Sequence, residues 1–350
     1  MTSFSKKEII EALAFRGGDQ RALHKRACGV RDVTVSNHLY LRGLIEISNI
    51  CSRDCYYCGI RASSRETPRY ELSREETLSC IETVSRCGIS SVVLQSGERR
   101  NAAWIENLAV TLADIKARYP QICITLSVGE LSLDEYRRMY DAGAERYLLR
   151  IETSSEKHYR QLHPPVMSFS ARLKSIEDMR RAGFQVGSGV MINSPFQTRE
   201  NLADDLLLLR ELDIDMCGMG PYIPHEQSPL AHLPWSRDMA LDLGLNMIAL
   251  LRMAMPDINI AATTALEALS PVGREQGLKA GANVVMPQFS PPARRKEYML
   301  YDNKPVDFEE YDTMMTGLAG AAEEAGMILN PADPGHSLHF RKRKKNGNTC

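Results

Sequence analysis

Short apolar runs rich in β-branched residues alternate with amphipathic segments along most of the chain. Each run has the length of a strand, and the segments between the runs have helical periodicity. Two of the helical segments begin with a capping box, Ser73 with Glu76 and Ser132 with Glu135. The eight apolar runs cover residues 44–48, 90–95, 122–128, 146–152, 186–192, 215–220, 258–264 and 283–287.

This alternation predicts an α/β protein folded as a (β/α)8 TIM-type barrel, with a doubly wound open sheet as the alternative. Residues 1–42 are expected to form an N-terminal helical extension packed against the barrel or capping it, and residues 43–305 the barrel itself. A C-terminal helical segment should follow over residues 306–335. Residues 336–350 are expected to be a disordered basic tail, because a charge run at a terminus is usually solvated.

Composition narrows the class of protein. The 350 residues include 43 Lys and Arg against 44 Asp and Glu, a near balance that gives no basis for binding nucleic acid or a membrane surface. No run of 18 apolar residues predicts a transmembrane helix, and the N-terminal segment lacks the apolar core of a secretory signal. Six of the nine cysteines are scattered, so a disulfide framework is not expected. We therefore expect a cytoplasmic protein.

The other three cysteines, Cys51, Cys55 and Cys58, follow the first apolar run within eight positions. The chemistry of a βα barrel gathers at the carboxyl ends of its strands, and the thiols would lie there. Thiolates bind zinc or iron–sulfur clusters. A structural zinc site needs four protein ligands. The nearest preceding histidines, His38 and His24, lie 13 and 27 residues before Cys51, which speaks against either as the fourth ligand. A cubane cluster usually takes four thiolates, so three would leave one iron open for a substrate or cofactor.

Polar residues also follow most of the other apolar runs. Because the carboxyl ends of barrel strands face one mouth, we expect these residues to converge near the three thiols. The polar segments are 95–98, 127–130, 150–153, 192–198, 220–225 and 262–265.

The spacing C-x3-C-x2-C, with Tyr57 before the last cysteine, resembles the signature of the radical S-adenosylmethionine (SAM) superfamily. That resemblance implies a 4Fe-4S cluster on the three cysteines, SAM chelated to the open iron, and reductive cleavage of SAM to a 5′-deoxyadenosyl radical. Within the superfamily, residues 40–305 resemble the HydE family of FeFe-hydrogenase maturases. The likeness rests on the segments RGLIEISNICSRDCYYCGIR, VVLQSGE, AGAERYLLRIET, GPYIPH, ATTA and GANVVMPQFSP, in this order.

The HydE resemblance implies roles for residues at the cofactor. Gly97 and Glu98 match the loop that meets the amino group of SAM. Glu152 is the expected acceptor for the ribose hydroxyls and Arg172 the partner of the carboxylate, pairings that suit a diol and a guanidinium fork. Ordinary ion pairing at the barrel rim is the alternative for these side chains. The cofactor-binding set is Tyr57, Gln95, Gly97, Glu98, Ser127, Glu130, Arg150, Glu152, Arg172 and Met191.

The resemblance also implies a substrate cavity inside the barrel. Arg146 and Arg150 stand at i and i+4, which puts both on one face of a strand. Two inward cations suggest an anionic guest, with pairing to Glu130 and Glu152 as the alternative. The residues expected at the substrate are Arg146, Thr263, Thr264, Tyr298 and Tyr301.

For the HydE family the implied substrate is a small organometallic anion, an iron complex with CO, cyanide and cysteine. A HydG-like maturase would deliver it, a HydF-like scaffold would receive the product, and ferredoxin or flavodoxin would supply electrons. One alternative is a paralogue that acts on an amino acid, as methylornithine synthase does. The other is a non-catalytic iron–sulfur scaffold, which would not cleave SAM.

Two departures from the family pattern stand out. The segment MINSPFQT places Asn193, Ser194 and Phe196 where the family usually shows Gly-Leu-Pro-Gly-Gln-Thr, and a bulky residue in place of glycine predicts an altered rim. The C-terminal cysteines that hold an auxiliary cluster in some members are absent, since Cys350 alone follows Cys217. This argues against biotin synthase, which uses a second cluster as its sulfur donor.

Overall fold

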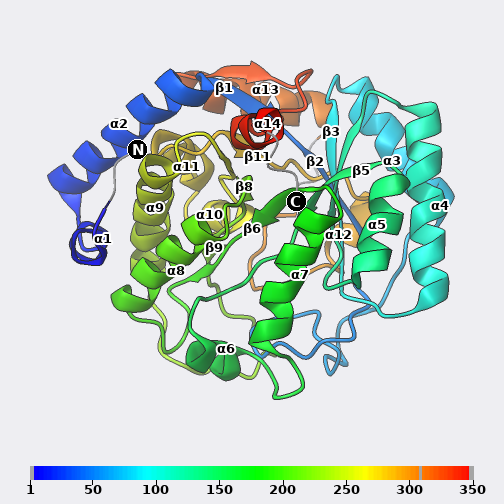
Figure 1. Cartoon of the computed structure of the whole chain (residues 1–350), viewed down its shortest axis with the longest axis horizontal. Coiled ribbons are helices and arrows are strands. Elements are labelled where there is room, and N and C mark those ends of the chain that lie inside the picture. The colour runs from blue at the N-terminus through cyan, green and yellow to red at the C-terminus, as the bar shows by residue number, and fades with distance from the viewer. Residues whose placement is uncertain (1–3, 307–309, 347–350) are drawn as a thin grey trace.

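A parallel sheet of seven strands curls around the centre of the molecule, with helices on its outer side (Figure 1). The computed structural model describes residues 4–306 and 310–346. The strand order in the sheet is β10-β8-β6-β5-β4-β3-β2. These strands are β2 (Gly43–Ser48), β3 (Ser91–Ser96), β4 (Cys123–Ser127), β5 (Ala144–Leu148), β6 (Gln185–Ser188), β8 (Met216–Cys217) and β10 (Asn259–Ile260).

An eighth strand, β11 (Val284–Val285), spans the gap between the two edges of the sheet. On one side Ala261 and Val284 form a parallel bridge, and on the other Leu44 is bridged to Gln288 just beyond β11. The chain therefore closes on itself, which confirms the predicted (β/α)8 barrel class over the open sheet. A short parallel pair, β7 (Met191–Ile192) with β9 (Gly220–Pro221), extends the wall at the carboxyl end.

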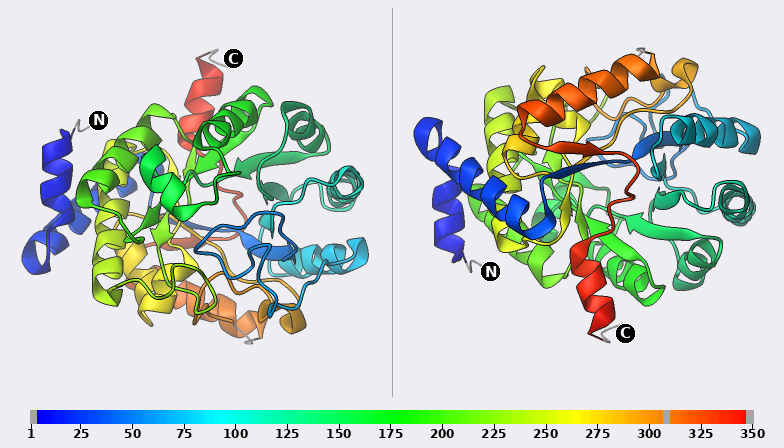
Figure 2. Two further views of the ribbon diagram at one scale, coloured as in Figure 1. Left: turned by 90° about the horizontal axis from the view of Figure 1, so that it is seen from below. Right: turned by 90° about the horizontal axis from the view of Figure 1, so that it is seen from above.

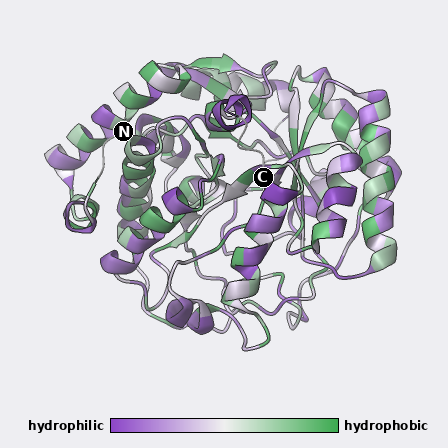
Figure 3. Cartoon of the chain, in the orientation of Figure 1, coloured by the Kyte–Doolittle hydropathy of each residue, from purple (hydrophilic) through white to green (hydrophobic). Residues whose placement is uncertain are grey.

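Helices follow the strands and pack on the barrel with their apolar faces inward. Both predicted capping boxes are present, at the starts of α3 (Arg74–Arg86) and α5 (Leu133–Asp141). Helix α9 (Arg237–Ala254) is largely apolar and mostly buried (Figure 3). The others are α4 (Ala102–Arg118), α6 (Glu156–Leu162), α7 (Phe169–Arg181), α8 (Arg199–Glu211), α10 (Thr264–Leu269), α11 (Gly273–Lys279) and α12 (Pro292–Arg295).

The chain before the barrel forms α1 (Lys6–Leu13) and α2 (Gly17–Val35), which lie beside α8 and α9 on the outside (Figures 1 and 2). Strand β1 (His38–Leu41), which the sequence patterns did not predict, pairs with β11 and with β12 (Ile328–Asn330) in a small parallel sheet. Helix α13 (Tyr311–Glu324) leads into β12. Across the described ranges, no helix is both long and apolar enough to cross a membrane.

The chain after β12 crosses the amino end of the barrel and finishes in helix α14 (Leu338–Lys345), shown in red in Figure 2. The prediction of a disordered tail is therefore wrong for this helix, while residues 347–350 lie outside the described residues. The basic run has acidic partners that are distant in sequence. Arg343 pairs with Asp215 at 2.6 Å and with Asp213 at 3.0 Å.

Candidate active site

The carboxyl end of the barrel opens into a cavity of about 310 Å³. Its walls come from the ends of most strands, which is where βα barrels carry their chemistry. The structure thus brings a cysteine of the trio together with residues expected at the cofactor and at the substrate. The residues expected from sequence that line the cavity are Tyr57, Cys58, Gln95, Glu98, Ser127, Arg150, Glu152, Arg172, Met191, Thr263, Thr264 and Tyr301.

The three clustered cysteines lie in the loop after β2, here called the cysteine loop (residues 49–69). Their thiols are free and partly buried. Burial raises the pKa of Cys58 to about 12, and the neighbouring charge of Cys51 adds to it. Burial likewise raises the pKa of Cys55, and the charges of Cys58 and Cys51 add to the effect. Cys58 lines the cavity, whereas Cys51 and Cys55 do not, and the three side chains are not grouped as a metal-ligand set in the described structure. As soft donors they suit an iron–sulfur cluster, whose iron charge would favour the thiolate forms.

Arg69 holds the cysteine loop in shape. Its guanidinium donates to the backbone oxygens of Asn49 and Ile60 at 2.8 Å, Arg61 at 2.6 Å and Ser64 at 3.0 Å. These carbonyls lie on both sides of the cysteine motif, so one side chain fixes both ends of the loop. The sequence patterns gave no sign of this role, since an arginine in a polar loop is most often solvated.

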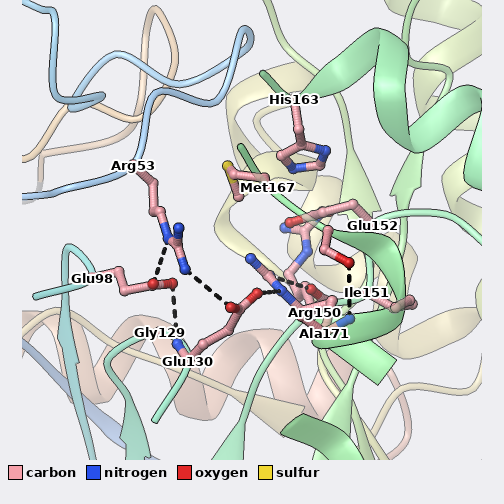
Figure 4. A network of polar contacts seen from close by, with 12 residues as sticks. Arg53, Glu98, Gly129, Glu130, Arg150, Ile151, Glu152, His163, Met167 and Ala171 are labelled. Carbon is pink, nitrogen blue, oxygen red and sulfur yellow. Dashed lines mark hydrogen bonds and ion pairs between the residues drawn. The ribbon is translucent and has the colours of Figure 1, made fainter. Parts of the chain in front are cut away.

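Two buried carboxylates, Glu98 and Glu130, lie beside the cysteine loop and share their cationic partners (Figure 4). Arg53 donates to Glu98 Oε1 at 2.5 Å and to Glu130 Oε2 at 3.0 Å. Arg172 of α7 donates to Glu130 Oε1 at 2.6 Å. Glu98 Oε2 also accepts from the Glu130 backbone N–H at 3.1 Å. Glu130 does not line the cavity but orients Arg172, which does.

Gly97 also lies behind the cavity wall rather than on it. A Cβ at this position would stand 2.7 Å from Cys51 Cβ and would clash with the backbone oxygen of Ile50. Glycine at residue 97 therefore lets the end of β3 pack directly against the cysteine loop.

Glu152 follows β5 with a backbone φ of 68°, in the left-handed region that is costly for a side chain other than glycine. Its Oε1 accepts from the Tyr57 hydroxyl at 3.5 Å, and its Oε2 lies 2.9 Å from Arg150 Nη2. The Tyr57 hydroxyl is also 3.2 Å from His163 Nε2. Burial lowers the pKa of His163 to about 3, so this imidazole is neutral. Glu152 is thus held in place with acceptor capacity to spare, which suits a diol.

Three hydrogen-bonding atoms of the cavity residues are buried and have no hydrogen-bond partner within the described parts of the chain. They are Arg150 Nε and Thr263 Oγ1, which can donate, and Glu152 Oε2, which accepts and lies beside the Arg150 guanidinium. A buried polar group without a partner costs about 1–3 kcal/mol. An anionic guest with acceptor atoms would satisfy the two donors, Arg150 Nε and Thr263 Oγ1, and Thr264 lines the same cavity.

A buried ion pair that the sequence patterns did not reveal lies at another wall of the cavity. Lys304 Nζ pairs with Glu46, and Gln288 donates to Glu46 Oε2 at 2.9 Å. Burial raises the pKa of Glu46, an effect that the Lys304 charge opposes. Tyr298, expected at the substrate, is buried behind this pair, where its backbone oxygen accepts from Lys304 at 2.9 Å. It does not line the cavity.

Arg146 is fully buried but lies away from this cavity, at the amino end of the barrel. It donates to Ser91 Oγ at 2.9 Å and to the Pro334 backbone oxygen at 2.5 Å, and it lies 3.4 Å from His336 Nδ1. Four residues of a strand cover about 13 Å, so Arg146 and Arg150 share a face but serve opposite ends of the barrel. The prediction that Arg146 would meet the substrate beside the two threonines is therefore wrong.

The segment that departs from the family pattern keeps a glycine-like backbone. Asn193 has a φ of 59° and Phe196 a φ of 67°, both in the left-handed region. The Phe196 side chain is 54% exposed, and Gln197 Nε2 donates to the Met191 backbone oxygen at 2.8 Å. The rim at this point gains an exposed ring, while Met191 stays fixed in the cavity wall.

Comparisons with known proteins agree with this arrangement. Residues 45–209 match the family described as the Radical SAM superfamily. The [FeFe] hydrogenase maturase subunit HydE of Thermotoga maritima is 38% identical over 310 residues, which cover 88% of this chain and 86% of that protein. A biotin synthase of Gloeothece citriformis is 26% identical over 298 residues, covering 81% and 80%.

Two solved structures share the fold. Methylornithine synthase (PylB) superposes with a TM-score of 0.80 at 23% identity, over 94% of this chain and 95% of that one. The FeFe-hydrogenase maturase HydG of Carboxydothermus hydrogenoformans gives a TM-score of 0.79 at 19% identity, over 96% of this chain and 78% of that one. At these identities the likeness establishes the barrel fold.

Proposed function

The chain belongs to the HydE family of the radical SAM superfamily, and from that membership we propose that it acts on an anionic iron complex during FeFe-hydrogenase assembly. It is a radical SAM enzyme whose cofactors are a 4Fe-4S cluster and SAM. When bound, these cofactors supply a 5′-deoxyadenosyl radical by reductive cleavage of SAM. The residues of the chain bind, orient and shield the reacting groups.

In this proposal Cys51, Cys55 and Cys58 hold the cluster. Arg172 meets the carboxylate of SAM, and Glu152 accepts from its ribose hydroxyls. The geometry supports these roles, because Arg172 and Glu152 line one cavity with Cys58. Glu98 adds a carboxylate near the amino group, and Tyr57, Gln95, Ser127 and Met191 complete the wall.

The substrate side of the proposal rests on the partnerless Arg150 Nε and Thr263 Oγ1 in the same cavity. Arg150 carries a permanent positive charge, and the Thr263 hydroxyl in the same cavity can donate to the same guest. An iron complex with CO, cyanide and cysteine is anionic and rich in acceptor atoms. Thr264 and Tyr301 would complete its contacts. The enclosing walls would keep water away from the reacting sulfur.

The proposed partners follow from the chemistry of this step. A reduced cluster needs a one-electron donor such as ferredoxin or flavodoxin. A labile iron complex needs a maturase that supplies it and a scaffold that accepts the product. We assign these tasks to HydG-like and HydF-like proteins, in keeping with the HydE relative.

The test of this function is SAM cleavage by reconstituted, chemically reduced protein. We expect 5′-deoxyadenosine from the unaltered chain and none from Cys55→Ala, because two thiols do not hold the cluster. Cys217→Ala is the matched control, since this buried cysteine lies outside the cysteine loop and should leave cleavage intact. A synthetic iron–cysteine complex should bind and raise the yield. Stimulation by an amino acid such as lysine, without a response to the iron complex, would contradict the proposed substrate.

A further inference from the structure

Two residues between the first two cysteines tie the cysteine loop to the end of β3. The Ser52 backbone N–H and hydroxyl both donate to the Glu98 backbone oxygen, at 2.8 and 2.9 Å. Arg53 reaches the Glu98 carboxylate at 2.5 Å and the Glu130 carboxylate at 3.0 Å (Figure 4). The Arg53 side chain is 14% exposed, and the two carboxylates are 5% and 7% exposed. Through Arg53, the cysteine loop therefore contacts both carboxylates from a largely buried position.

The two carboxylates would repel each other without a cation between them. Buried charges interact far more strongly than solvated ones, so the cation that matters is the buried one. Arg100 also contacts both carboxylates, at 3.4 Å for Glu98 and 3.1 Å for Glu130, but its side chain is 60% exposed. Its attraction is therefore screened by water. Arg53 bridges the same two carboxylates from a more buried position, and its planar guanidinium can span two acceptors.

We propose that Arg53 is a positioning residue that couples the cysteine loop to the SAM site. It acts through Glu98, which lines the cavity, and through Glu130, which orients Arg172. Because Arg53 is part of the cysteine loop, a loop ordered by its cluster presents both carboxylates correctly. Cluster loading and SAM binding then reinforce each other, and such a coupling is reciprocal. The inference rests on the proposed function, which requires both cofactors at this mouth.

The variants Arg53→Gln, Arg53→Lys and Arg100→Gln separate positioning from a general effect of positive charge. In cluster-loaded protein, Arg53→Gln should keep its iron and bind SAM about ten- to a hundred-fold more weakly, the loss expected for a charge-assisted hydrogen bond. Arg53→Lys should recover part of this affinity, since an ammonium restores the charge but not the fork. Arg100→Gln should change the affinity by less than about threefold. Calorimetry and the change that SAM causes in the spectrum of the reduced cluster report binding without turnover.

The reciprocal effect gives a second measurement. SAM should slow the removal of iron by a chelator from the unaltered protein, and this protection should be weaker in Arg53→Gln. Equal losses in Arg53→Gln and Arg100→Gln, unchanged SAM affinity in Arg53→Gln, or loss of its iron would each overturn the positioning role. If the unaltered protein itself bound no SAM, the proposed function would fail, and this inference with it.

Discussion

At the scale of single residues, the cavity carries a hydrogen-bond acceptor proposed for SAM and a hydrogen-bond donor proposed for the substrate. Glu152 is an acceptor held by a strained backbone, with the Tyr57 hydroxyl on one oxygen. Thr263 offers a buried hydroxyl that has no partner in the described parts of the chain. Arg150 belongs to both sets, because its Nη2 pairs with Glu152 while its Nε has no hydrogen-bond partner among the described residues. A test of these two roles should therefore alter Glu152 and Thr263 and leave Arg150 in place.

Glu152→Gln should weaken SAM binding about ten- to a hundred-fold and barely affect the iron–cysteine complex, because the amide keeps the shape but loses the charged acceptor. Thr263→Val should do the reverse, with a loss of about three- to tenfold for the complex, as expected for one neutral hydrogen bond. Both affinities are measured in both variants by calorimetry. Parallel losses of both ligands in each variant would show that these side chains support the wall and do not divide the ligands.

The sequence revealed residues whose role depends on near neighbours in the chain. The cysteine trio and the Ser73 box are local patterns, so they could be recognised without a structure. The pairing of Glu46 with Lys304 joins residues 258 positions apart, and no local pattern marks it. Arg53 lay inside the recognised motif, yet its partners come from two other strand ends, so its role became visible only in the fold.

At the scale of elements, the order of strands and helices followed from periodicity. Which residues lie at which end of the barrel did not follow from it. Alternation along β5 showed that Arg146 points inward, whereas only the register places it at the amino end beside Pro334. The basic run after residue 336 was predicted to be solvated, because a local pattern does not show contacts with residues that are distant in sequence. Its acidic partners lie on loops far away in sequence, and together they dock helix α14.

Helix α14 is docked through a histidine held between two carboxylates. His339 Nε2 lies 2.6 Å from Asp213 and His339 Nδ1 lies 3.0 Å from Asp257, while Lys342 and Arg343 pair with the same acids. Hydrogen bonds to the two carboxylates raise the pKa of His339 to about 9 from an ordinary 6.5. A raised pKa in the folded state means that the stabilisation is complete below pH 6.5 and is lost as the pH rises through about 9.

His339→Gln should therefore destabilise the docking of α14 by roughly 1–3 kcal/mol at pH 6 and by little at pH 10. Hydrogen exchange of the α14 amides across this pH range is the measurement. Ser337→Ala is a useful control, because it removes the cap of the same helix and should act equally at both pH values. A His339→Gln effect that did not change with pH would show that the imidazole acts by packing alone.

At the scale of the whole molecule, the barrel has one open mouth and one covered end. The chain around Gly335 crosses the amino end, where Asn259 donates to its backbone oxygen at 2.7 Å and Gln185 accepts from the Ser337 N–H at 3.0 Å. Cys58 of the cysteine loop, most of the proposed SAM residues and the proposed substrate residues Thr263, Thr264 and Tyr301 line the cavity at the other end. This arrangement favours a single metal centre at the mouth.

The iron content of the purified, reconstituted chain tests this arrangement. Cys123 lies in β4 and Cys217 in β8, each buried and apart from the cysteine loop. In the described ranges no three His, Cys, Asp or Glu side chains stand grouped to hold a metal ion, those of the cysteine loop included, so the single centre proposed there rests on the cysteine motif. We expect about four irons and four sulfides per chain, the content of one cubane. Cys55→Ala should lower both nearly to zero. About eight irons in homogeneous protein, or iron–sulfur absorption that survives in Cys55→Ala, would reveal a second cluster and contradict the single-centre arrangement.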